Sequence, residues 1–436
     1  MRLAGRLRRL GRLDRPDRLG WLRWLAVDVG PLRIPAYRRI FVGYGVSFLG
    51  FQVTAVAVPV QLFAITGSSV YVGILGLVQI GPLIGFGLWG GAVADAADRR
   101  LVALASSLVV WAVTLGLLAQ ALLGLRSVAL ILALMAVQAA AFAIAQPTRG
   151  AIVPRLVPRE QVAAANTLSF TMSNVATIAG PLAAGLVIGR SSGYAWAYAL
   201  DALLFTIGLY ATLRLPRLPP LGESTRPGLR SVVDGLRYIA GRPVLLLSFA
   251  VDIAAMVLAM PRALFPEVAA RRFGGVGAVG WLFAAMAVGA VLAGLSSGWI
   301  GRVRRQGLAL VGAVVGWGVA VALAGLARSL WLAVLLLALA GGFDLISAVY
   351  RQTILQVYAP DEMRGRLQGV FIVVVTGGPR LGDARAGLVA GVVGATASWV
   401  AGGVACVVLA VTLAVVFPTL RHYSAAGGTP RGSRAG

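Results

Sequence analysis

The 436-residue chain has no lysine, one cysteine and one histidine, and only 12% of its residues are charged. Soluble domains carry about 25% charged residues. A chain that is 59% hydrophobic cannot cover such a core with a polar surface, so we expect one membrane domain. Cys406 and His422 are too few for a disulfide framework or a His/Cys metal site. The sequence therefore predicts no metal and no cofactor.

Catalytic signatures are also missing. With a single histidine and no lysine, no nucleophile-base pair, phosphate loop or metal-ligand cluster can be identified. The formal net charge is +24, but the 39 basic residues are all arginine and lie mostly between apolar runs. Nucleic-acid binders concentrate their basic residues in one stripe. These observations argue against an enzyme and against a nucleic-acid partner.

Long apolar runs dominate what is present. About 20 apolar residues in a helix cross a bilayer, because lipid offers the backbone no hydrogen-bond partners. Twelve such runs predict an all-α membrane fold of two six-helix bundles, which leaves no extramembrane receptor domain. They cover residues 40–66, 70–94, 101–125, 127–148, 162–189, 191–213, 244–265, 273–301, 306–327, 329–350, 367–392 and 396–417.

Arginine distribution predicts the orientation. If the N-terminus is cytoplasmic, 31 of the 39 arginines fall on the cytoplasmic side, so the positive-inside rule places both termini there. The chain is expected to begin with an Arg-rich arm (1–36) and a first bundle (37–213). A cytoplasmic linker with a short amphipathic helix (214–243) then leads to a second bundle (244–417) and a tail (418–436).

The two halves contain a repeated pattern of arginine, then proline nine residues later, then glutamate two further on. The residues are Arg149, Pro158 and Glu160 in the first half and Arg351, Pro360 and Glu362 in the second. Because the two sets are 202 residues apart and occupy the same connection, duplication is the simplest explanation. Two related bundles can rock about a site between them and expose it alternately to each side.

The loop at residues 91–100 reads GAVADAADRR. It resembles the signature loop of the major facilitator superfamily, with departures at Ala96 and Asp98. The resemblance implies twelve helices in two bundles and a gating role for this loop. The matching functional residues are Gly91, Asp95, Arg99 and Arg100.

The fifth apolar run carries Gly180, Pro181 and Gly185, with Ala184 in place of one glycine of the superfamily's antiporter motif. The motif is similar to that of exporters, and small residues let helices approach closely. The resemblance implies export. An importer or a uniporter remains the alternative within transport, and a receptor or enzyme the alternative of another class.

Segments 251–256, 260–266 and 377–383 are similar to the enterobactin-exporter-like branch of transmembrane secretion effectors. The similarity extends over about residues 35–420. It implies efflux of an amphipathic siderophore, metabolite or drug across a bacterial plasma membrane. The expected partners are a small molecule, protons and lipid, and we expect a monomer.

Charged groups inside a membrane are costly and are usually functional. Asp252 and Asp344 lie within apolar runs and are our proton-coupling candidates. For Asp383, the spacing to Arg380 predicts a structural ion pair. Asp201 is expected near the outer headgroups.

The substrate path should be polar but uncharged where it meets a bulky amphipathic ligand. In the superfamily the first and fourth helices of each half build this path. The candidates are Gln52 and Gln61 in the first run and Gln138 in the fourth.

Overall fold

The computed structural model describes residues 28–96, 98–189, 193–219, 236–358 and 364–421. These residues form helices joined by short connections. The first half comprises α3 (Pro35–Thr66), α4 (Ser69–Ala96), α5 (Arg99–Leu122), α6 (Val128–Leu156), α7 (Val162–Ile188) and α8 (Gly193–Leu213). The second comprises α10 (Pro243–Ala259), α11 (Phe265–Arg272), α12 (Gly277–Leu295), α13 (Gln306–Leu326), α14 (Leu330–Tyr358), α15 (Arg364–Val393), α16 (Ala395–Val416) and α17 (Pro418–Arg421).

Local sequence explains the helix boundaries. Proline is favoured in the first helical turn, and Pro35 and Pro243 begin the first helix of each half. Ser127 caps α6 by accepting a hydrogen bond from the Leu130 amide at 3.3 Å. Gly67 ends α3 with φ of 65°, a conformation that glycine adopts without strain.

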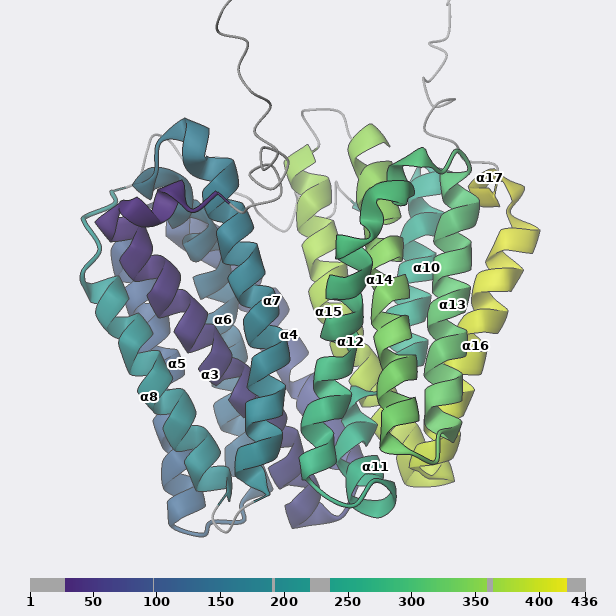
Figure 1. Ribbon diagram of the computed structural model, residues 1–436, viewed down its shortest axis with the longest axis horizontal. Coiled ribbons are helices and arrows are strands. Elements are labelled where there is room, and N and C mark those ends of the chain that lie inside the picture. The colour runs from purple at the N-terminus through teal and green to yellow at the C-terminus, as the bar shows by residue number, and fades with distance from the viewer. Residues whose placement is uncertain (1–27, 97, 190–192, 220–235, 359–363, 422–436) are drawn as a thin grey trace, which may run out of the picture.

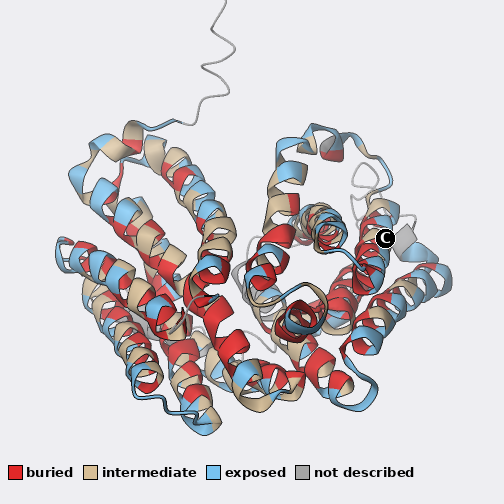
Figure 2. Cartoon of the chain, turned by 60° about the horizontal axis from the view of Figure 1, so that its bottom comes forward, coloured by how far each residue is buried: buried red, intermediate tan, exposed pale blue. Residues whose placement is uncertain are grey.

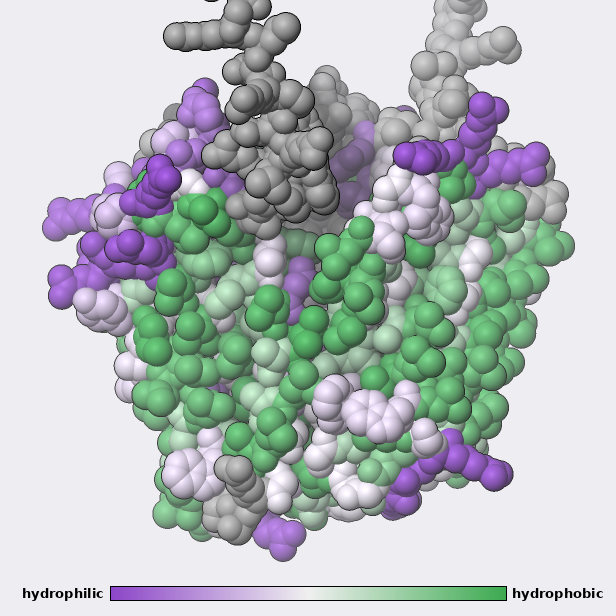
Figure 3. Space-filling model, viewed as in Figure 1, coloured by the Kyte–Doolittle hydropathy of each residue, from purple (hydrophilic) through white to green (hydrophobic). Residues whose placement is uncertain are grey.

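Apolar side chains cover the flanks of the molecule, and hydrophilic side chains gather toward its two ends (Figure 3). Buried residues face the interior of each bundle (Figure 2), while large apolar side chains such as Leu186, Leu295 and Val392 remain exposed. Eleven described helical segments are long and apolar enough to cross a membrane. The further long helix, α15, has 30 residues and contains Arg380, Asp383 and Arg385. The twelve-helix, two-bundle expectation is confirmed.

The seventh span is interrupted, which the sequence prediction did not anticipate. Helix α10 stops at Ala259, a 3₁₀ turn follows at Arg262–Leu264, and α11 then runs from Phe265 to Arg272. Pro261 precedes the turn and Pro266 stands in the first turn of α11. Proline has no amide hydrogen and cannot continue a helix ladder. The break places Arg262 in the turn between α10 and α11.

The two halves meet through two helix pairs, α4 with α15 and α7 with α12. The beginning of α3 and helix α17 lie at one end of the molecule, here called the terminal end, and α11 lies at the opposite far end (Figure 1). Glycines allow close contact near the far end. A Cβ on Gly387 would lie 2.9 Å from the Gly73 Cα, and one on Gly185 would lie 3.2 Å from the Gly280 Cα.

Toward the terminal end the same interface is loose. Added Cβ atoms on Gly81 and Gly85 of α4, or on Gly377 of α15, would meet no atom within 4 Å. The halves are therefore packed together at the far end and separated at the terminal end.

Candidate substrate site

A cavity of about 300 Å³ lies between the two halves, next to the packed far-end contacts. Helices α3, α4, α6 and α7 form one wall, and the α10–α11 break, α12 and α15 form the other. Small-molecule sites are typically apolar hollows with a few placed polar groups. This cavity has that character.

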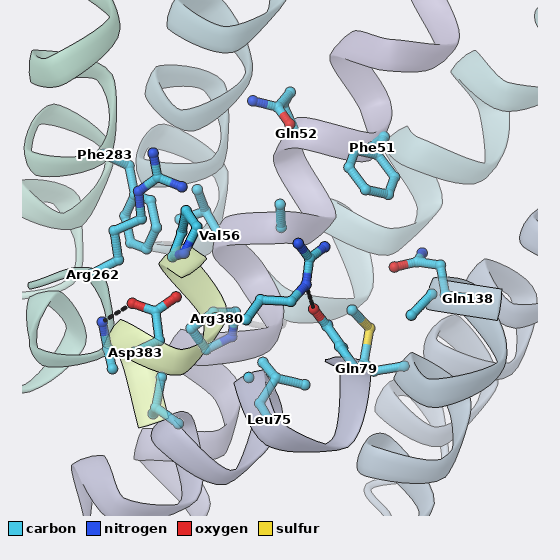
Figure 4. A pocket seen from close by; sticks show the side chains of 18 of the residues that line it. Phe51, Gln52, Val56, Leu75, Gln79, Gln138, Arg262, Phe283, Arg380 and Asp383 are labelled. Atoms are coloured by element: carbon cyan, nitrogen blue, oxygen red, sulfur yellow. Dashed lines mark hydrogen bonds between the residues drawn. The ribbon is translucent and has the colours of Figure 1, made fainter. Parts of the chain in front are cut away.

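The first-half wall presents neutral amides. Gln52, Gln79 and Gln138 line it, and the sequence predicted the first and last of these. Gln138 is 3% exposed, and its Nε2 has no hydrogen-bond partner among the described residues. Its side chain extends toward the cavity (Figure 4). A buried donor without a partner is unfavourable, so a ligand acceptor here would be stabilising.

The second-half wall is charged. Arg262, Arg380 and Asp383 line it. The Asp383 carboxylate accepts a hydrogen bond from the Ala263 amide at 3.2 Å, which fixes it at the break in the seventh span (Figure 4).

The predicted ion pair between Asp383 and Arg380 is not formed as a direct contact within the described chain. Arg380 instead donates from Nε to Gln79 Oε1 at 3.1 Å and from Nη1 to the Thr376 carbonyl at 2.7 Å. Its side chain points across the interface toward α4, away from Asp383 (Figure 4). The i,i+3 spacing identified two neighbouring charges but could not show that the other half supplies an acceptor.

Aromatic rings flank the cavity on both sides. Phe51 and Phe142 stack with centroids 5.1 Å apart and planes at 11°. Phe283, on the opposite wall, is held by an edge-on contact with Phe265 at 5.0 Å. The site combines flat apolar surfaces with amides on one wall and charges on the other.

Gln61 does not face this cavity, which corrects its assignment to the substrate path. It exchanges hydrogen bonds with Gln120, at 3.0 and 3.3 Å, and accepts one from the Tyr198 hydroxyl at 2.6 Å. Nine residues are two and a half helical turns, so Gln52 and Gln61 lie on different faces of α3. Gln61 joins α3 to α5 and α8.

Asp252 pairs with Arg351 in the second half. The first half has a related contact, because the Arg149 guanidinium lies 4.6 Å from the Tyr44 ring centroid. The positions correspond in the two halves. Tyr44 and Asp252 each lie nine residues after the first residue of their helix, α3 or α10. Arg149 and Arg351 each lie 21 residues after the first residue of α6 or α14. The duplication thus preserves a contact between the first and fourth helices of each half.

The other buried carboxylates differ in their partners. Asp344 is half-buried on α14 and lies within electrostatic range of Arg262. Asp201 is 1% exposed and accepts hydrogen bonds from the Thr54 and Thr114 hydroxyls at 2.6 and 3.2 Å. Asp201 is therefore enclosed within the first bundle, and its expected level near the outer headgroups stays a prediction.

The predicted gating loop is only partly visible. The surroundings of Gly91 and the side chain of Asp95 lie outside the described part of the structure. Asp98 caps α5 by accepting from the Arg100 amide at 2.9 Å, and the Arg100 guanidinium donates to the Leu213 carbonyl at 2.8 Å. The Arg99 amide donates to the Leu218 carbonyl at 3.1 Å. These contacts tie the loop to the segment that follows α8.

The exporter-like motif lies at the interface between halves. Gly180 permits α7 to pack against Gln52 of α3, and Gly185 faces Gly280 of α12. Pro181 lines the cavity. The motif is thus in position to contribute to both helix crossing and substrate contact.

The sequence prediction missed two features of the interface. Arg262 and the Ser69–Glu267 contact received no role in the predicted site. Ser69 Oγ donates to Glu267 Oε2 at 2.5 Å, joining α4 to α11. The available signal for Arg262 was its position directly after a proline inside an apolar run.

Known proteins share this organisation. The family described as "Transmembrane secretion effector" matches residues 26–433. Among curated relatives, the enterobactin exporter EntS of Escherichia coli (strain K12) is 29% identical over 394 residues, covering 89% of this chain and 93% of that protein. EntS of Shigella dysenteriae serotype 1 (strain Sd197) matches with the same identity and coverage.

Solved structures support the fold. The nucleoside transporter NupG matches with a TM-score of 0.72 and 14% identity, covering 88% of this chain and 99% of that one. A bacterial homologue of the human lysosomal transporter Spinster, in an inward-facing and unoccupied conformation, matches with a TM-score of 0.68 and 16% identity. That match covers 90% of this chain and 99% of that structure.

Proposed function

Since the chain belongs to the transmembrane secretion effector family of the major facilitator superfamily, and is thus a secondary transporter, we propose that it exports an amphipathic small molecule by proton antiport. Its curated relative EntS is an enterobactin exporter. A siderophore, another metabolite or a drug is the corresponding substrate class here.

One observation carries the proposal. A cavity with amides, charges and aromatic rings lies between two halves that are packed at one end and apart at the other. Rocking the halves about this cavity would open the far end as the terminal end closes. The sequence assigns 31 of the 39 arginines to the connections on the side of the N-terminus. This supports a cytoplasmic terminal end, so the structure would correspond to an inward-facing state.

Proton coupling requires a group whose protonation favours one state. We propose Asp252 and Asp344 for this role, since each is enclosed near an arginine. Protonation of either carboxyl removes its attraction for that arginine, and a contact made in one conformation only would shift the equilibrium between conformations. Asp95, Arg99 and Arg100 are proposed to latch the terminal end when it closes.

The test is transport in inverted membrane vesicles with a panel of siderophores, aromatic acids and amphipathic drugs, with and without an imposed pH gradient. We expect accumulation of at least one compound, stimulated by an acid interior. A proton moving across 100 mV releases about 2.3 kcal/mol, or roughly fifty-fold in concentration. If accumulation is the same with and without the pH gradient, proton antiport is overturned. Transport out of the inverted vesicles would favour an importer.

A further inference from the structure

The charges of the cavity are unevenly distributed between its two walls. Arg262, Arg380 and Asp383 lie on the second-half wall, and the first-half wall contributes the neutral amides of Gln52, Gln79 and Gln138. Arg385, nearby on α15, is occupied by backbone carbonyls, because it donates to Val257, Leu258 and Ser398. Arg262 and Arg380 are therefore the arginines available to a ligand.

These two arginines lie within electrostatic range of each other. Like charges held close together repel. Asp383 lies within electrostatic range of three arginines, Arg262, Arg380 and Arg385. Asp344 lies within electrostatic range of Arg262 from outside the lining. Two carboxylates therefore accompany three arginines, and one positive charge is left without a counterion. The cavity is thus electrostatically prepared for an anion.

The Arg262 side chain is accessible to a ligand from the cavity. It is exposed although the residues around it on the break, Pro261, Ala263 and Leu264, are buried, and its guanidinium extends into the cavity beside Phe283 (Figure 4). Within the described residues the guanidinium makes no direct hydrogen bond or ion pair, and its interactions with Asp344 and Asp383 are electrostatic. Guanidinium groups bind carboxylates and similar anions through paired hydrogen bonds.

The opposite wall suits a flat ring. Phe51 and Phe142 form a stacked surface, and the unpartnered Gln138 Nε2 beside it offers a hydrogen bond. An anionic group at Arg262 and Arg380 and an aromatic group near Phe51 would occupy both walls at once.

We propose that the cavity binds an aromatic organic anion, with its acidic group between Arg262 and Arg380 and its ring against Phe51 and Phe142. This assignment rests on the proposed function, because it identifies the substrate class of the same site. It has a mechanical consequence. An anion bound to Arg380 competes with Gln79 Oε1, which Arg380 now contacts across the interface, so binding weakens one link between the halves.

Equilibrium binding to the full chain in lipid nanodiscs tests the assignment with three probes of one shape: 1-naphthoate, 1-naphthamide and 1-naphthylmethylammonium. A charge-assisted hydrogen bond contributes more than a neutral one, so we expect naphthoate to bind at least about tenfold more tightly than naphthamide. Arg262→Gln and Arg380→Gln should each remove most of this preference. Arg262→Lys should retain part of it.

Arg328→Gln is the matched control, because Arg328 is an exposed arginine in the connection between α13 and α14, outside the cavity lining. It should keep the preference, and all variants should elute as a single species with an unchanged Tm before they are compared. Equal or tighter binding of the amide or the ammonium compound overturns the assignment. So does the absence of binding by all three probes.

Vesicle transport separates the two proposals. Gradient-driven export of neutral or cationic compounds, with no selectivity for the anion, would leave the export proposal standing and overturn the anion site. Arg262-dependent binding of naphthoate without transport of any compound would support the anion site and overturn the export proposal.

Discussion

Ser69 Oγ donates a 2.5 Å hydrogen bond to Glu267 Oε2, and this contact joins α4 of the first half to α11 of the second at the far end. Both side chains are buried, and Glu267 also pairs with Arg271 of its own helix at 2.6 Å. Separation of the halves at this end must break the contact between Ser69 and Glu267.

Ser69→Ala should therefore favour opening of the far end. A hydrogen bond to a charged group contributes about 1.5–3 kcal/mol, so the open population should rise about tenfold or more. The measurement is the rate at which an impermeant maleimide added from the far side labels Gln52→Cys in the cavity. Cys406, the only native cysteine, is first replaced by alanine.

Ser68→Ala is the control for this variant. Ser68 Oγ accepts only a local hydrogen bond, from the Val70 amide at 3.3 Å. Its labelling rate should match that of the parent. Equal rates for Ser69→Ala and Ser68→Ala would show that the inter-half contact does not hold the far end closed.

The helix crossing between α7 and α12 should be sensitive to a single methyl group. A Cβ on Gly280 would overlap the Pro181 carbonyl oxygen, whereas a Cβ on Gly277, one turn earlier, would meet nothing within 4 Å. Gly280→Ala should disfavour the far-end-closed state by about 1–3 kcal/mol, the usual effect of overpacking. Gly277→Ala should have little effect. The same maleimide assay compares them, and similar rates for the two variants would contradict the packing described here.

Long apolar runs made the helices and their number predictable from sequence, because each run must satisfy its own backbone in lipid. The role of Gly180 and Gly185 in helix contact was also accessible, since small residues permit close approach. Side-chain direction was not. Gln61 and Gln138 are equally polar in sequence, and only the packing shows that one bonds to Gln120 and Tyr198 while the other faces the cavity.

Those two glutamines provide a matched comparison. Gln61→Leu leaves the buried groups of Gln120 and Tyr198 without their partner, so it should reduce stability by about 1–3 kcal/mol and leave substrate preference unchanged. Gln138→Leu removes a donor that has no partner, so it should preserve Tm and raise the apparent KM. Thermal unfolding and vesicle transport measure the two effects. A lowered Tm for Gln138→Leu with unchanged KM would contradict its assignment to the cavity.

The Asp252–Arg351 contact allows folding and proton coupling to be separated. Asp252→Asn leaves Arg351 buried without its counterion, which should reduce stability by about 3–5 kcal/mol. The double variant Asp252→Asn/Arg351→Gln removes both charges and should recover much of that loss. If Asp252 carries the coupled proton, the double variant should still lack stimulation by a pH gradient. Full stimulation in a stably folded double variant would exclude Asp252 from coupling.

Rocking of two bundles about the shared cavity is the central claim, and pulsed electron paramagnetic resonance tests it most directly. Spin labels replace Leu125 and Arg328 in one Cys406→Ala protein, and Arg159 and Arg304 in another. All four residues are exposed and lie in connections between helices. The first pair lies at the far end, with one residue in each half, and the second pair lies at the terminal end in the same way. As a transported substrate or an imposed change in pH shifts the population, the 125–328 distance should lengthen while the 159–304 distance shortens. Distances that stay fixed, or that change in the same direction, during active transport would contradict the account.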